Sequence, residues 1–80
     1  MKLPRDISGI DLAKKLTKYG YSLTRQRGSH MRLATNLKGK HHITIPAYKA
    51  LPIDILDSIL ADLSEHLEIK KSVLLNELFQ

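Results

Sequence analysis

The chain has 80 residues, a length that predicts one domain over residues 1–80 and leaves no room for a large enclosed active site. It contains no cysteine, which excludes a disulfide framework, a thiolate metal site and a thiol nucleophile. Residues 1–50 carry eleven Lys or Arg against two Asp, a net charge of +9, whereas residues 51–80 carry two Lys against six acidic residues, a net charge of −4. The basic first part favours a polyanionic partner such as nucleic acid.

The first element expected along the chain is a helix over residues 9–19. Ser8 is the expected N-cap, with Asp11 three residues later, and apolar residues then recur at helical spacing as far as Tyr19. Gly20 supplies the stop.

From Tyr21 onward the hydrophobic period changes to two, which predicts three strands. Arg27-Gly28 and residues 36–40 are the expected turns, and such short connections predict an antiparallel meander. One face of this sheet should be apolar and the other polar, with Tyr21 and Leu23 of the first strand on the apolar side.

After Pro52 the helical period returns, and a last apolar-rich segment predicts a third helix over about residues 69–79. The apolar face of the helix after Pro52 is expected to hold Ile53, Leu56, Ile59, Leu60 and Leu63. Its acidic face, with Asp57, Asp62 and Glu65, is interpreted as a solvated or partner-binding surface. The order α-β-β-β-α-α predicts a two-layer α+β domain, with a core at about residues 8–65 and helices packed on the apolar sheet face.

His30 is the residue best suited to chemistry, because the alternation places it on the polar sheet face, opposite in direction to Met31. Arg32 follows on the same side, and the third strand should bring His42 or Thr44 nearby. RNA supplies its own nucleophile, the 2′-OH, so cleavage requires an acid, a base and positive charge. A histidine exchanges protons near neutral pH, and Arg32 can stabilise the developing charge. The alternative is that His30 is an ordinary polar surface residue.

Adjacent His41 and His42 point to opposite faces of a strand, so they cannot easily share one ion, and neither Cys nor an acidic cluster accompanies them. We therefore expect no metal site, and the lack of a phosphate-binding glycine loop argues against a nucleotide cofactor. His41 is expected toward the core in a structural role, whereas His42 is a candidate for RNA binding.

The remaining candidates for RNA binding are basic or lie beside His30. For each basic residue, a solvated basic rim is an equally open interpretation. The candidates are Ser29, Arg25, Arg27, Arg32, Lys38, Lys40 and Lys49.

Three segments together resemble the HicA (YcfA-like) toxin family of bacterial and archaeal toxin–antitoxin pairs. They are Gly28-Ser29-His30 at the start of the second strand, His42-Ile43-Thr44-Ile45-Pro46 in the third, and Ile59-Leu60 in the following helix. The resemblance runs to about Leu63. It implies a fold like that of the double-stranded-RNA-binding domain, ribosome-independent mRNA cleavage, a catalytic role for His30, and inhibition by a HicB-type antitoxin that covers the site.

The favoured hypothesis is the toxin of a type II toxin–antitoxin system, a metal-independent mRNA endonuclease acting on single-stranded or structured mRNA. His30 would be the general acid or base, and the second group is left open between His42, a lysine and water. A non-catalytic RNA-binding module of the same fold is the alternative. A third hypothesis is an interaction subunit whose acidic C-terminal helices dock a partner or a second copy, giving a homodimer. The apolar runs are too short to span a membrane and the N-terminus lacks a secretion signal, so a cytoplasmic location is expected.

Overall fold

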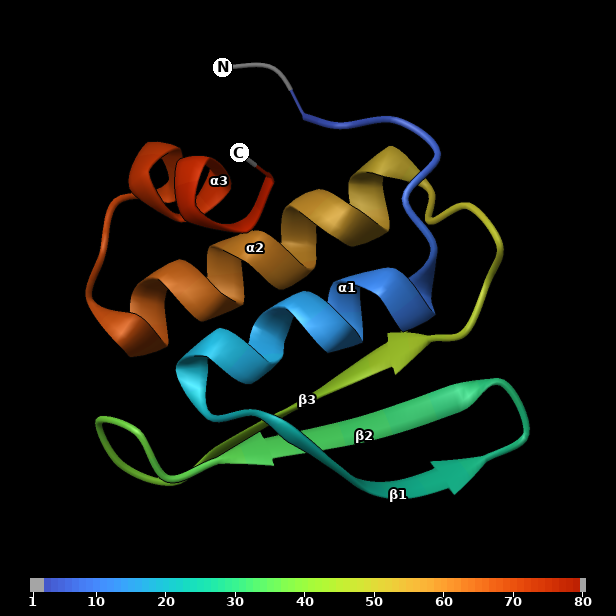
Figure 1. Ribbon diagram of the computed structural model, residues 1–80, viewed down its shortest axis with the longest axis horizontal. Helices are drawn as coiled ribbons and strands as arrows, with labels where there is room; N and C mark the ends of the chain where they lie inside the picture. The colour runs from blue at the N-terminus through green and yellow to red at the C-terminus, as the bar shows by residue number, and fades with distance from the viewer. Residues whose placement is uncertain (1–2, 80) are drawn as a thin grey trace.

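The computed structural model describes residues 3–79 and shows the predicted order α-β-β-β-α-α (Figure 1). The elements are α1 (Gly9–Lys15), which continues as the 3₁₀ turn η1 (Leu16–Tyr19), β1 (Ser22–Arg27), β2 (His30–Thr35), β3 (His41–Pro46), α2 (Ile53–Leu67) and α3 (Lys71–Phe79). Of the domain predicted over residues 1–80, residues 1, 2 and 80 lie outside the described part. None of the helices within residues 3–79 is long and apolar enough to cross a membrane.

The segment formed by α1 and η1 starts and stops at the predicted residues, and its last turn is a 3₁₀ helix. The Ser8 hydroxyl accepts a hydrogen bond from the amide of Asp11 at 3.0 Å, and Gly20 ends the following turn with a φ of +79°. At the start of the helix, Gly9 lies against the end of β3, where an added Cβ would stand 1.9 Å from the Pro46 carbonyl oxygen. This contact requires glycine and fixes α1 at the end of β3.

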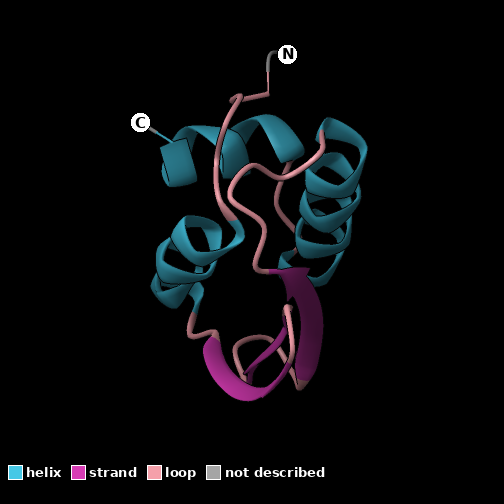
Figure 2. Ribbon diagram, turned by 90° about the vertical axis from the view of Figure 1, so that its right-hand side faces the viewer, coloured by secondary structure: helices cyan, strands magenta, loops and turns pink. Residues whose placement is uncertain are grey.

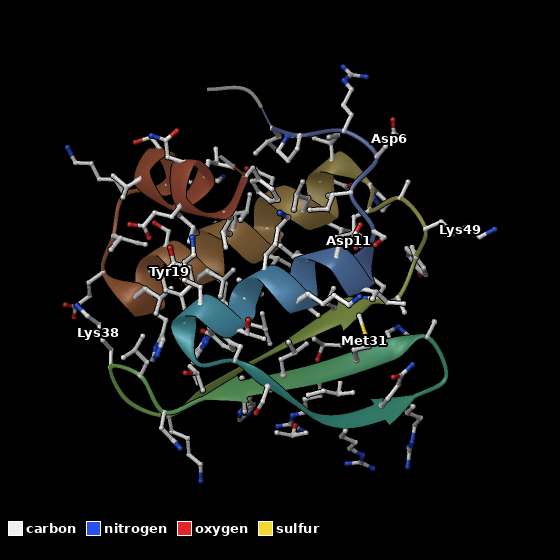
Figure 3. All side chains as sticks on the ribbon, viewed as in Figure 1. Asp6, Asp11, Tyr19, Met31, Lys38 and Lys49 are labelled. Atoms are coloured by element: carbon white, nitrogen blue, oxygen red, sulfur yellow. The ribbon has the colours of Figure 1, made fainter. Side chains whose placement is uncertain are left out.

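The three strands form an antiparallel sheet in the order β1-β2-β3, as predicted. Figure 2 shows all the helices on one side of this sheet, with the other side open. The apolar side chains of β2 and β3 that point toward the helices are buried, among them Met31, which is labelled in Figure 3. The sheet contributes Met31, Leu33, Ile43 and Ile45 to the core, and α2 contributes Leu56, Ile59, Leu60, Leu63 and Leu67. Ile53, the first residue of α2, was also expected on the apolar face of this helix, but it is 45 % exposed.

Strand β1 departs from the expected burial, because all six of its residues are exposed. Leu23 pairs with Leu33 and is therefore on the helix side of the sheet, but 53 % of it is exposed. The predicted side of Leu23 is confirmed, but the residue is exposed because α1, fixed at the end of β3, does not cover β1. A shallow apolar groove of about 250 Å³ remains between α1 and β1, with Ile10, Leu23 and Met31 among its lining residues.

Helix α3 packs on the domain and does not project from it. Its residues Leu74 and Leu78 are buried, and Lys71 at its start forms an ion pair with Asp57 of α2. Near its end, the Tyr19 hydroxyl donates a hydrogen bond to the carboxylate of Glu77. Burial, reinforced by this carboxylate, raises the pKa of Tyr19 well above its usual range. The third helix is therefore an integral part of the core.

Candidate nucleic-acid interface

His30 is the first residue of β2 and follows directly on the turn Gly28-Ser29. The turn is made possible by the φ of +59° at Gly28, and it is held by a hydrogen bond of 2.6 Å from the Ala47 amide to the Ser29 carbonyl oxygen. The structure extends β1 through Arg27, one residue beyond the predicted strand end. Arg27 and His30 consequently pair across the two strands, and both are exposed.

A β-bulge in β1 decides which side chains surround His30. The register shifts by one residue between Leu23, which pairs with Leu33, and Arg25, which pairs with Arg32. Strict alternation would place Arg25 and Arg27 on the side of Leu23, facing the helices. The extra residue, Thr24, moves both arginines to the face of His30, and its hydroxyl donates a 3.2 Å hydrogen bond to the Arg32 carbonyl oxygen.

The sheet side that faces away from the helices is here named the open sheet face, and it is basic. Its polar side chains include Ser22, Arg25, Arg27, His30, Arg32, His42 and Thr44. Residues 12–53, which include the whole sheet, contain no Asp or Glu. With no carboxylate in the sheet, the arginines around His30 produce a positive potential that attracts phosphate groups.

Spacing along β2 separates the two exposed histidines of this face. Arg32 is two residues from His30, a distance of about 6.6 Å along the strand. His42 pairs with Ala34, four residues from His30 in register, which places it about 13 Å away along the strand. The predicted proximity therefore holds for Arg32 and Thr44, which pair with each other, but not for His42.

The predicted lysines do not gather at His30. Lys38 lies in the turn between β2 and β3, where it is 3.6 Å from the Glu68 carboxylate. Lys49 follows β3 at the end of the sheet that holds His30, three residues after Pro46, but its side chain points away from the sheet (Figure 3). Lys40 lines a shallow pocket of about 230 Å³ together with His42. The structure thus brings Arg25, Arg27 and Arg32 to His30 and spreads the lysines around the rim.

His41 points to the helix side, as predicted, and belongs to a network of polar groups. Its Nε2 donates to Asp62 Oδ1 at 3.2 Å, and its Nδ1 accepts from the Tyr21 hydroxyl at 2.7 Å. Its ring stacks on that of His66 with centroids 4.2 Å apart. Burial, with a contribution from the charge of Asp62, raises the pKa of Tyr21 to about 12. Within residues 3–79 no three His, Asp or Glu side chains group as a metal site.

A polar pocket at the outer edge of β3 was missed by sequence reasoning. It has a volume of about 440 Å³ and lies between Arg32 and Thr44 of the sheet and Ser58 and Asp62 of α2. The acidic face of α2 was expected to be solvated or to bind a partner, and no periodicity in the sequence separates Asp62 from the other acidic residues of that face. Its position depends on how α2 packs beside β3.

The fold and the open sheet face define a small α+β domain with the element order α-β-β-β-α-α and a basic sheet surface. A family model described as "HicA toxin of bacterial toxin-antitoxin" matches residues 9–64, and the chain belongs to this family. The match begins with α1 and ends within α2, so α3 lies beyond it. Comparisons with curated proteins and with solved structures gave no match. Membership of this family implies an antitoxin as a partner.

Proposed function

We propose that this chain is an mRNA endonuclease, the toxin of a type II toxin–antitoxin pair, and that His30 is its catalytic residue. The observation that carries the proposal is the position of His30 at a strand junction on the open sheet face, between Arg27 and Arg32. HicA toxins are known as RNases, and the membership of the chain in this family supports the assignment.

The reaction needs no group beyond RNA, His30, the arginines and water. The 2′-oxygen attacks the adjacent phosphorus, the bond from phosphorus to the 5′-oxygen breaks, and the products end in a 2′,3′-cyclic phosphate and a 5′-OH. If His30 acts as the base, it takes the 2′-OH proton and water protonates the leaving oxygen; if it acts as the acid, these roles are exchanged. Arg27 and Arg32 stabilise the negative charge that accumulates on the phosphoryl oxygens.

His42 is not the second proton carrier in this mechanism. It is about 13 Å from His30 along the sheet, which is beyond hydrogen-bond reach of the same phosphodiester. Lys38 and Lys40 lie at the other end of the sheet, and Lys49 points away from it. Water is therefore assigned that role, and His42 is assigned to binding RNA farther along the face.

The test is incubation of a structureless mRNA in EDTA with the parent, His30→Ala and His42→Ala proteins, each shown by circular dichroism to be folded. The parent should cleave the RNA and His30→Ala should not. His42→Ala should retain cleavage with a higher KM, because it binds RNA more weakly. Fragments should carry 2′,3′-cyclic phosphate ends, and 3′-OH ends would reject the mechanism. Intact RNA with the folded parent, together with salt-sensitive binding, would instead establish the non-catalytic RNA-binding module.

The remaining assignments follow from this activity. An mRNA substrate places the toxin in the cytoplasm, and a HicB-type antitoxin would inhibit it by covering the open sheet face. A homodimer stays a prediction, and sedimentation equilibrium of the purified chain tests it.

A further inference from the structure

The polar pocket at the edge of β3 has walls of opposite charge. Its volume of about 440 Å³ falls within the range of about 300–1,000 Å³ that is typical of small-molecule sites. The sheet contributes Arg32, His42 and Thr44, and α2 contributes Ser58 and Asp62. The pocket joins the open sheet face at the Arg32–Thr44 pair, about 6.6 Å along the strands from the pair that contains His30.

Asp62 is held in place by contacts outside the pocket. His41 donates to its Oδ1 at 3.2 Å, and the His41 ring is in turn fixed by the Tyr21 hydroxyl and by stacking on His66. The Asp62 side chain is nevertheless 55 % exposed, and a carboxylate offers about four lone-pair sites, of which this hydrogen bond uses one. In the described part of the chain Asp62 is hydrogen-bonded to His41 and forms no ion pair with Arg32, which lines the sheet side of the pocket. The pocket therefore presents a preorganised acceptor facing a cation.

A nucleotide satisfies both walls, whereas a free phosphate or a simple cation satisfies only one. Asp62 repels a free phosphate, and Arg32 repels a cation. A nucleotide carries a phosphate at one end and N–H donors on its base at the other, and Ile43 and Ile59 supply an apolar lining against which a base can rest. Among the four bases, guanine presents two adjacent N–H donors on its Watson–Crick edge, the pattern that a carboxylate binds in a bidentate manner.

We propose that this pocket recognises a guanosine next to the cleaved phosphodiester, with Asp62 accepting hydrogen bonds from the guanine N–H groups and Arg32 contacting the phosphate. Asp62 is thus the residue that determines sequence preference, and it takes no part in proton transfer. The inference rests on the proposed function in that it takes RNA to be the ligand.

The first experiment maps the 5′-OH ends made from a long mRNA by the parent, Asp62→Asn and Glu65→Gln proteins. Glu65→Gln is the matched control, because it removes the same charge from an exposed position one turn away on α2. A bidentate base contact discriminates by about 5- to 150-fold, so Asp62→Asn should lower the ratio of cleavage beside guanosine to cleavage beside uridine by at least about fivefold. Glu65→Gln should preserve the ratio. A merely structural role of Asp62 would lower cleavage at all sites equally and leave the ratio unchanged, which would overturn the inference.

The second experiment measures binding without cleavage, in the His30→Ala background. The probes are a hexauridine and the same oligonucleotide with one guanosine. The guanosine probe should bind more tightly, and Asp62→Asn should abolish the difference. Equal binding of the two probes, or a preference that survives Asp62→Asn, would overturn the inference. If the parent fails to cleave RNA but shows this Asp62-dependent preference, the endonuclease assignment fails and the guanosine site stands.

Discussion

Neutralising the three arginines of the open sheet face should change the salt dependence of RNA binding in a way that an equal loss of charge elsewhere does not. The variant Arg25→Gln/Arg27→Gln/Arg32→Gln lowers the net charge from +5 to +2. Each phosphate contact on a single strand contributes about 0.7 to the slope of log K against log salt, so three contacts contribute about 2. Between about 50 and about 200 mM salt, that difference in slope corresponds to about a 20-fold difference in the loss of affinity.

The assay is fluorescence anisotropy of a labelled, unstructured RNA, titrated at several salt concentrations with proteins that also carry His30→Ala to prevent cleavage. The matched control is Lys14→Gln/Lys15→Gln/Lys18→Gln, which reaches the same net charge through exposed residues of the α1–η1 segment on the helix side of the sheet. The parent and the control should show the same steep slope of log K against log salt, and the slope of the arginine variant should be shallower by about 2. Equal reductions in both triple variants would show that RNA responds to net charge alone, and the assignment of the open sheet face would be refuted.

Two further predictions concern stability. Folding raises the pKa of Tyr21 from 10.0 to about 12, so the unfolded chain loses the Tyr21 proton at a lower pH than the folded chain. The Tyr21 contribution to the free energy of unfolding should therefore fall by about 1.4 kcal/mol per pH unit between pH 10 and pH 12. Urea unfolding of the parent and Tyr21→Phe at pH 10 and 11 should show their difference shrinking accordingly, and parallel curves would contradict it. In the same urea unfolding assay, Leu33→Ala should lower the free energy of unfolding by about 2–5 kcal/mol, because Leu33 is buried. Leu23→Ala should lower it by only about 1 kcal/mol or less, because Leu23, which pairs with Leu33, is exposed. Similar losses for the two variants would contradict the observed exposure of β1.

The elements and the position of His30 were predictable because they depend on local rules. The Ser8 cap is a contact between residues three apart, and the placement of His30 opposite to Met31 follows from the two-residue period of a strand. The same rule separated His41 from His42 correctly, sending one to the helix side and the other to the open sheet face. None of these results requires knowledge of which elements touch.

The residues that surround His30 could not be predicted as well from the sequence, because they depend on pairing between strands. Alternation along β1 assigns Arg25 and Arg27 to the helix side, and only the bulge at Thr24 reverses this assignment. No residue in the segment marks the bulge, since it arises from the register of β1 against β2. The exposure of Leu23 likewise depends on where α1 lies, which the contact between Gly9 and the end of β3 decides.

By itself, the sequence determined the class of fold, the charge asymmetry between the two parts of the chain, and the face on which His30 and Arg32 lie. These properties reside in periodicity and composition, which the chain carries at every residue. The tertiary structure decided that three arginines surround His30, that His42 is distant from it, and that Asp62 faces Arg32 across a pocket. Each of these depends on register or on helix-to-sheet packing, which are set by contacts between residues far apart in the chain and leave no periodic signal.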